Sequence, residues 1–130
     1  MSQRLILVID DEVDTIDLVE AAFQRRGYEV IGAWNGHTGM QLARERCPAL
    51  ILIDLMLPEI DGFDVCRQLR HDPVTAHIPR VILSARASLT DQAAAAAAGA
   101  DRYLMKPVGI KALVGVVEEL LPRTCTAGER

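Results

Sequence analysis

The stretch LILIDLMLP, residues 50–58, leads an apolar run into a single carboxylate, Asp54. A short run of aliphatic residues bounded by turn signals is typical of a buried strand, so a charged residue at its end is unexpected. The stretch RLILVIDDEVD, residues 4–14, repeats the pattern, because its apolar residues run directly into the adjacent acids Asp10 and Asp11. The two runs predict two strands whose three acids lie at one site.

The rest of the chain alternates short runs of Ile, Leu and Val with longer segments of helical period, which is the pattern of βα units around a parallel sheet. Strands are predicted over 5–10, 28–33, 50–54, 80–84 and 102–105. Helices are predicted over 13–26, 36–46, 62–70, 89–98 and 110–121. Gly27 and Gly99 directly follow two of these helices, where glycine readily adopts the left-handed conformation of a C-cap. We therefore predict a doubly wound α/β fold of three layers, with helices on both faces of the sheet and right-handed crossovers.

Composition limits the class of protein. A chain of 130 residues fits one domain, and a half-hydrophobic, quarter-charged composition is ordinary for a globular chain. The net charge is -4 and no stripe of lysine and arginine is evident, which disfavours direct binding of nucleic acid. No apolar stretch approaches the roughly 20 residues of a membrane span, and no signal peptide precedes the first predicted strand. We expect no membrane segment and a cytoplasmic location.

The last predicted helix ends before Pro122, and RTCTAGER, residues 123–130, has no apolar period. Because proline cannot continue a helix, we predict one domain over 1–122 and a tail, or the beginning of a linker, over 123–130. The chain is then either a free-standing protein, which we favour, or one domain of a longer protein.

The cysteines and histidines indicate no metal site of their own. The three cysteines are widely spaced and form no C-x-x-C pair, so we expect free thiols: Cys47, Cys66 and Cys125. The histidines lack the spacing that places two imidazoles on one helical face, so we expect surface positions for all three: His37, His71 and His77.

Ligands of open parallel sheets collect outside the carboxyl ends of the strands, and five polar residues stand at such ends: Asp10, Asp11, Asp54, Ser84 and Lys106. Two carboxylates about 4 Å apart repel by roughly 4 kcal/mol at an effective dielectric near 20, so three acids need a cation or raised pKa values. Oxygen ligands without histidine or cysteine suit Mg²⁺, with Mn²⁺ as a substitute. With a lysine and a hydroxyl nearby, Asp54 is predicted to act as a nucleophile that forms an acyl phosphate.

Each of these residues also has a structural interpretation. An acid after a strand is often the N-cap of the next helix, which applies to Asp11 and to Asp54 taken singly. Ser84 alone would be a turn residue, and Lys106 alone a solvated charge. The functional hypothesis depends on all five standing at strand ends.

At these positions the chain, from residue 5 to about 121, resembles the receiver domain of two-component response regulators. The motifs are VIDDE (8–12), LIDLMLPEIDG (52–62), ILSA (82–85) and YLMKP (103–107), in the same order and at the same strand ends. The resemblance implies a flavodoxin-like (βα)5 sheet with strand order 2-1-3-4-5.

The resemblance also implies a role for each site residue. Asp54 is expected to be the phosphoacceptor, with Mg²⁺ held by Asp54, by Asp11 directly, by Asp10 mainly through water, and by the backbone carbonyl of Met56. Ser84 is expected to hydrogen-bond the phosphoryl group. Lys106 is expected to pair with that group, and the bond from Lys106 to Pro107 to be cis. Tyr103 is expected to be either a switch residue whose ring moves inward on activation or a tyrosine at the rim.

The resulting hypothesis is a signalling receiver that accepts a phosphoryl group from a sensor histidine kinase or a phosphotransfer protein of a phosphorelay. Its only expected reactions are its own phosphorylation and dephosphorylation. The surface formed by segments 89–98, 102–105 and 110–121 is expected to switch and to bind a downstream protein. The alanine run 93–98 either packs closely or forms a smooth docking face on this surface, and we favour close packing.

Two alternatives come from other classes of protein. A phosphohydrolase of the haloacid dehalogenase type would also use aspartate, lysine and Mg²⁺, but its D-x-D-x-T pattern fits neither DDEVD nor DLMLP. A phosphorylation-independent interaction module would be expected to lose Asp54 or Lys106, and this chain has both.

Overall fold

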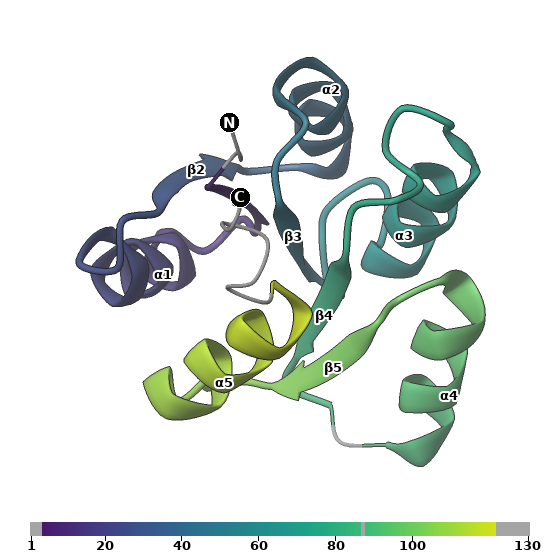
Figure 1. Cartoon of the computed structure of the whole chain (residues 1–130). Coiled ribbons are helices and arrows are strands. Elements are labelled where there is room, and N and C mark those ends of the chain that lie inside the picture. Colours follow the sequence, from purple (N-terminus) through teal and green to yellow (C-terminus); the bar gives the residue numbers. More distant parts are fainter. Residues whose placement is uncertain (1–3, 87, 122–130) are drawn as a thin grey trace.

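A computed structural model describes residues 4–86 and 88–121 as five βα units (Figure 1). The strands are β1 (Leu5–Ile9), β2 (Glu29–Ala33), β3 (Leu50–Asp54), β4 (Arg80–Ser84) and β5 (Arg102–Met105). The helices are α1 (Val13–Gln24), α2 (Gly36–Arg46), α3 (Gly62–His71), α4 (Leu89–Ala98) and α5 (Ile110–Leu120). Every predicted element is present, with bounds that differ from the prediction by at most two residues. The predicted domain end at Pro122 and the tail lie outside the described residues.

The five strands form one parallel sheet in the order β2-β1-β3-β4-β5, as predicted. Helices α1 and α5 lie on one face of this sheet and α2, α3 and α4 on the other, which completes the three layers (Figure 1). The strand order reverses between β1 and β3, so the carboxyl ends of these two strands open the crevice in which such sheets bind ligands.

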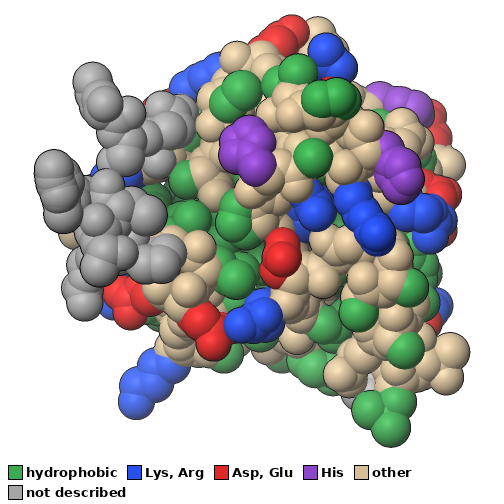
Figure 2. Space-filling model, turned by 45° about the vertical axis from the view of Figure 1, so that its right-hand side comes forward, with side chains coloured by type: hydrophobic (Ala, Val, Ile, Leu, Met, Phe, Trp, Pro, Cys, Tyr) green, Lys and Arg blue, Asp and Glu red, His purple; other side chains and the backbone are tan. Residues whose placement is uncertain are grey.

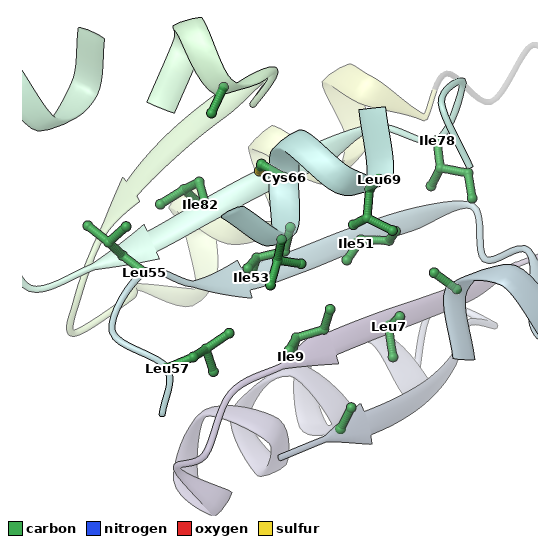
Figure 3. Close-up of a cluster of buried hydrophobic side chains, with 14 of the residues drawn as sticks. Leu7, Ile9, Ile51, Ile53, Leu55, Leu57, Cys66, Leu69, Ile78 and Ile82 are labelled. Carbon is green, nitrogen blue, oxygen red and sulfur yellow. The ribbon is translucent and has the colours of Figure 1, made fainter. Parts of the chain in front are cut away.

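Burial on both faces explains why the central strands read as continuous apolar runs. All five residues of β1, β3 and β4 are buried. Alternate residues point to opposite layers: Ile51 and Ile53 join the cluster under α2, α3 and α4 (Figure 3), whereas Leu50 and Leu52 join the cluster under α1 and α5. Each fully buried aliphatic side chain contributes about 1.5–3 kcal/mol, so the strands that lead to Asp10, Asp54 and Ser84 are also the most strongly held.

The helix ends follow ordinary capping chemistry. Ser88 accepts hydrogen bonds from two backbone N–H groups at the start of α4, and Gly99 closes that helix with φ 104°. In the alanine run, Ala95 and Ala98 are buried, which confirms close packing for one face of α4. The rest of α4 exposes alanines together with Thr90 and Gln92, and Leu89 at its start is 82% exposed.

The cysteines and histidines that the structure describes occupy ordinary positions. Cys47 is exposed and Cys66 is buried, and both are free thiols. Burial raises the pKa of the Cys66 thiol to about 12, which keeps it protonated. All three histidines are exposed, and the purple side chains in Figure 2 lie at the surface. Within residues 4–86 and 88–121, no helix has the length and apolar character needed to cross a membrane.

The loop from β3 to α3 packs directly on the backbone of Asp54. The N–H of Gly62 donates a 2.9 Å hydrogen bond to the carbonyl oxygen of Leu55. A Cβ at Gly62 would lie 2.6 Å from the carbonyl oxygen of Asp54 and 2.8 Å from the Cα of Leu55. Only glycine therefore allows α3 to begin this close to the end of β3.

We expect Gly62→Ala to destabilise the fold by about 1–3 kcal/mol, because the added methyl meets backbone atoms that cannot move aside. Gly115→Ala is the matched control: apart from its chain neighbours and the backbone of its own helix, no described atom lies within 4 Å of a Cβ there, and alanine in a helix interior stabilises by about 0.5–1 kcal/mol. Urea unfolding of both variants measures the difference. A Gly62→Ala variant as stable as the parent would contradict the close approach.

Candidate functional site

The carboxyl ends of four strands place the site residues along one edge of the sheet. Asp10 follows β1 directly and Asp54 is the last residue of β3, while Ser84 ends β4 and Lys106 follows β5. Backbone hydrogen bonds to neighbouring strands hold Asp10 and Lys106. The N–H of Asp10 donates to the carbonyl oxygen of Ala33 at 2.9 Å, and the N–H of Lys106 donates to the carbonyl oxygen of Ser84 at 2.7 Å. The side chains are therefore positioned by the sheet itself.

The three acids form a cluster that is able to bind a metal ion. One oxygen from each of Asp10, Asp11 and Asp54 lies within 4.8 Å of the others. Asp10 is fully buried and Asp54 is 5% exposed, whereas Asp11 is open to solvent. Hard carboxylate oxygens, with one side open to water, suit a hard divalent cation.

One oxygen of Asp10 supports this interpretation. Oδ1 accepts a hydrogen bond of 2.9 Å from the backbone N–H of Glu12. Oδ2 is buried and accepts no hydrogen bond from any described residue, although the Lys106 Nζ lies 2.9 Å away as an ion-pair partner. Buried polar atoms normally have hydrogen-bond partners, so an oxygen left short of them fits a position meant for a cation or its water.

Lys106 is the cation that the structure places among these acids. Its Nζ lies 2.9 Å from Asp10, 2.6 Å from Glu12 and 3.5 Å from Asp54. Burial on its own would lower the pKa of Lys106, but the hydrogen bond to Glu12 and the ion pairs with Asp10 and Asp54 raise it above its ordinary value. The lysine is therefore charged at any physiological pH.

Asp54 has a perturbed pKa. Burial and the neighbouring charge of Asp10 raise it from 3.8 to about 6, against the opposing effects of Lys106 and of a hydrogen bond from the Met56 backbone. Strongly perturbed carboxyls in a crevice are frequent at functional sites. At neutral pH most of the Asp54 population still carries the charge that a nucleophile needs.

A hollow of about 310 Å³ gives access to this cluster and is lined by Asp11, Glu12, Asp54, Met56, Ala85 and Lys106. The Met56 side chain is 59% exposed at its edge. The peptide bond between Lys106 and Pro107 is cis, the isomer that the sequence resemblance implies.

Ser84 and Tyr103 are joined through one backbone segment. The buried Oγ of Ser84 accepts a 3.0 Å hydrogen bond from the N–H of Arg86, and the hydroxyl of Tyr103 donates to the carbonyl of Arg86 at 2.8 Å. The Arg86 guanidinium makes two hydrogen bonds with Asp91 on α4, at 2.9 and 2.8 Å. Arg86 thus contacts both predicted switch residues and α4.

Glu12 is a member of the site that was not predicted from the sequence. Glu12 closes the motif VIDDE, but its contact with Lys106 spans 94 residues of chain. Its only signal in the sequence is its place directly after two site acids.

Comparison with known proteins agrees with this geometry. Residues 6–118 match the sequence profile of the response regulator receiver domain. The chain is 43% identical over 119 residues to the DNA-binding dual master transcriptional regulator RpaA of Synechocystis sp., a match that covers 92% of this chain and 49% of RpaA. It is 42% identical over 108 residues to the response regulator PleD of Caulobacter vibrioides, a match that covers 83% of this chain and 24% of PleD.

Among solved structures, the receiver domain of the Francisella response regulator 1452 is similar, with a TM-score of 0.85 and 30% identity. That match covers 94% of this chain and 99% of the other. The chain therefore matches nearly the whole of an isolated receiver domain. It spans about half of the length of RpaA and about a quarter of the length of PleD.

The raised pKa of Asp54 predicts a pH-dependent effect of Asp54→Asn in the absence of divalent metal. Asparagine resembles the protonated acid, which the fold favours, so the parent loses stability relative to the variant as the pH rises from about 4 through 6. The variant should be more stable by at most about 3 kcal/mol at pH 8, and the difference should vanish near pH 4. Urea unfolding in EDTA at several pH values measures it.

Asp17→Asn, at an exposed position on α1, controls for the loss of one negative charge. A difference between Asp54→Asn and the parent that is the same at pH 4 and pH 8 would contradict the raised pKa.

Proposed function

The chain belongs to the response regulator receiver family, and on this premise we propose that it is a phosphorylation-dependent switch with Asp54 as the phosphoacceptor. One observation carries the proposal above all. A buried carboxylate at the end of a central strand faces two further acids and a charged lysine, in a hollow that is open to a donor. This arrangement supplies a nucleophile and a cation at the same place.

In the proposed reaction an oxygen of Asp54 attacks the phosphorus of a phosphohistidine on the donor protein. The P–O bond forms as the P–N bond breaks, and the imidazole keeps the electron pair and takes up a proton from water. Asp10, Asp11, Asp54 and the carbonyl of Met56 would hold a divalent cation, which we propose to be Mg²⁺. When bound, this ion would offset the charge of the transferring oxygens.

Two residues of the chain would then hold the phosphoryl group. Lys106 lies 3.5 Å from Asp54 and needs only a small movement to pair with an added phosphoryl oxygen. Ser84 presents a buried hydroxyl at the end of the neighbouring strand, and the Asp54 and Ser84 strands are paired in the sheet. A hydroxyl and an ammonium together provide two donors for the oxygens of the acyl phosphate.

Movement of Ser84 would be transmitted through Arg86. When the Ser84 Oγ turns toward the phosphoryl group, the segment that bears Arg86 follows, because its N–H is bonded to that oxygen. The Tyr103 hydroxyl donates a hydrogen bond to the carbonyl of Arg86, so the Tyr103 side chain would move when Arg86 moves. We propose that the surface of α4, β5 and α5 is thereby switched, as a two-state element biased by a local charge.

Exposed apolar side chains on this surface support a role in binding a downstream protein. Leu89 on α4, Met105 on β5 and Ile110 on α5 are 82%, 44% and 47% exposed. Upstream, the proposed partner is a sensor histidine kinase or a phosphotransfer protein, and the proposed location is the cytoplasm. Relatives such as RpaA are about twice the length of the matched region, so the downstream partner is either a further domain of the same polypeptide or a separate protein.

We expect acetyl phosphate with Mg²⁺ to add one phosphoryl mass to the intact protein, and EDTA to prevent the addition. Asp54→Asn keeps the size of the side chain but removes the nucleophile, so it should show no adduct, whereas the exposed-site control Asp17→Asn should label as the parent does. Ser84→Ala and Lys106→Ala should still label but fail to switch fully. Intact-mass spectrometry measures the adduct, and labelling of Asp54→Asn to the extent of the parent would reject the proposal.

A further inference from the structure

Lys106 is shared unequally among three acids. Its Nζ donates a hydrogen bond to Glu12 at 2.6 Å, whereas Asp54, the proposed phosphoacceptor, lies 3.5 Å away. The Lys106 side chain is 14% exposed and that of Glu12 is 63% exposed. The closest partner of this lysine is therefore the acid most open to water, outside the buried pair Asp10 and Asp54.

The position of Glu12 in the fold is unusual for its residue type. Glu12 is the N-cap residue of α1, yet its side chain makes no capping hydrogen bond. At the corresponding positions of α2, α3 and α4, the side chains of Asn35, Asp61 and Ser88 each accept a bond from their own helix. Glu12 instead extends its side chain to Lys106. The first turn of α1, like that of α5 with Gly109 as its N-cap, therefore lacks the side-chain cap that α2, α3 and α4 have.

We propose that Glu12 is a positioning residue that holds Lys106 in a resting place at the rim and competes for it with the phosphoryl group on Asp54. The inference rests on the proposed function and adds an element of regulation to the same site. In the resting state Lys106 donates to Glu12. In the phosphorylated state it must exchange this bond for one to a phosphoryl oxygen, which lies beyond the Asp54 carboxylate.

Exposure and charge make this exchange feasible. A solvent-exposed carboxylate is screened by water and its ion pair is weak, so Glu12 can be displaced by a more highly charged group at short range. The Lys106 ammonium is less exposed than its Glu12 partner, and it therefore gains more from a dianionic oxygen inside the hollow than from Glu12 at its edge. Glu12 would set how strongly the switched state is favoured, without preventing it.

The test is calorimetric binding of beryllium fluoride, an anion that mimics a phosphoryl group on a carboxylate, at saturating MgCl₂. Glu12→Gln removes the charge of the competitor. Glu12→Asp keeps the charge but is shorter by one methylene and does not reach Lys106. Asp14→Asn removes an equal charge from the first turn of the same helix, at an exposed position; among the described residues Lys106 forms its ion pairs with other acids.

We expect both Glu12 variants to bind beryllium fluoride about threefold to tenfold more tightly than the parent, and Asp14→Asn to bind within about twofold of it. The side-chain ammonium signal of Lys106 in NMR spectra should also change in both Glu12 variants before any anion is added, and not in Asp14→Asn. A gain in Glu12→Gln that Asp14→Asn reproduces, or one that Glu12→Asp lacks, would show a general effect of charge and overturn the proposal.

Different results would contradict the phosphorylation of Asp54 and the role of Glu12. A parent protein that binds no beryllium fluoride in the presence of Mg²⁺ would overturn the phosphorylation proposal, and the competition with it. A parent that binds the anion, with both Glu12 variants binding equally well, would overturn the role of Glu12 and leave the phosphoacceptor unaffected.

Discussion

The burial of two carboxylates beside a single lysine is the constraint on which the rest of the site depends. Asp10 and Asp54 stand where β1 and β3 end, and the sheet holds their backbones so that the side chains cannot separate. Lys106 offsets part of their repulsion, yet the pKa of Asp54 still rises to about 6 because burial and Asp10 outweigh the lysine. A further positive charge near the cluster would relieve this repulsion, which is why the same residues suit a divalent cation.

The path from the site to the surface is short and consists of named contacts. Ser84 and Tyr103 both bond to the backbone of Arg86, whose guanidinium is paired with Asp91 in the first turn of α4. Helix α4 buries only alanine side chains within the described chain, so it is held by less apolar surface than helices that bury Val, Leu or Phe. A helix held in this way is a reasonable element for a small change at Ser84 to displace.

The fold could be predicted well from the sequence because the central strands are nearly continuous apolar runs and glycine or proline marks several of the element ends. Strands β3, β4 and β5 and helices α2 and α4 have the predicted bounds, whereas α1 ends at Gln24, two residues early, because the chain already turns before Gly27. The convergence of Asp10, Asp54 and Lys106 follows from their places at strand ends. The pairing of Lys106 with Glu12 could not be predicted, because it depends on the direction of two long side chains that are 94 residues apart. The pKa of Asp54 likewise depends on burial that only the packed structure defines.

The measurement that tests the central claim most directly is the location of the phosphoryl group within the chain. Borohydride reduces an aspartyl phosphate to homoserine, which peptide mass spectrometry assigns to one position after phosphorylation by a donor in the presence of Mg²⁺. The account predicts homoserine at position 54 and at neither of the neighbouring acids, Asp10 and Asp11. Homoserine at position 10 or 11, or none at position 54 in a sample whose intact mass shows the adduct, would contradict it.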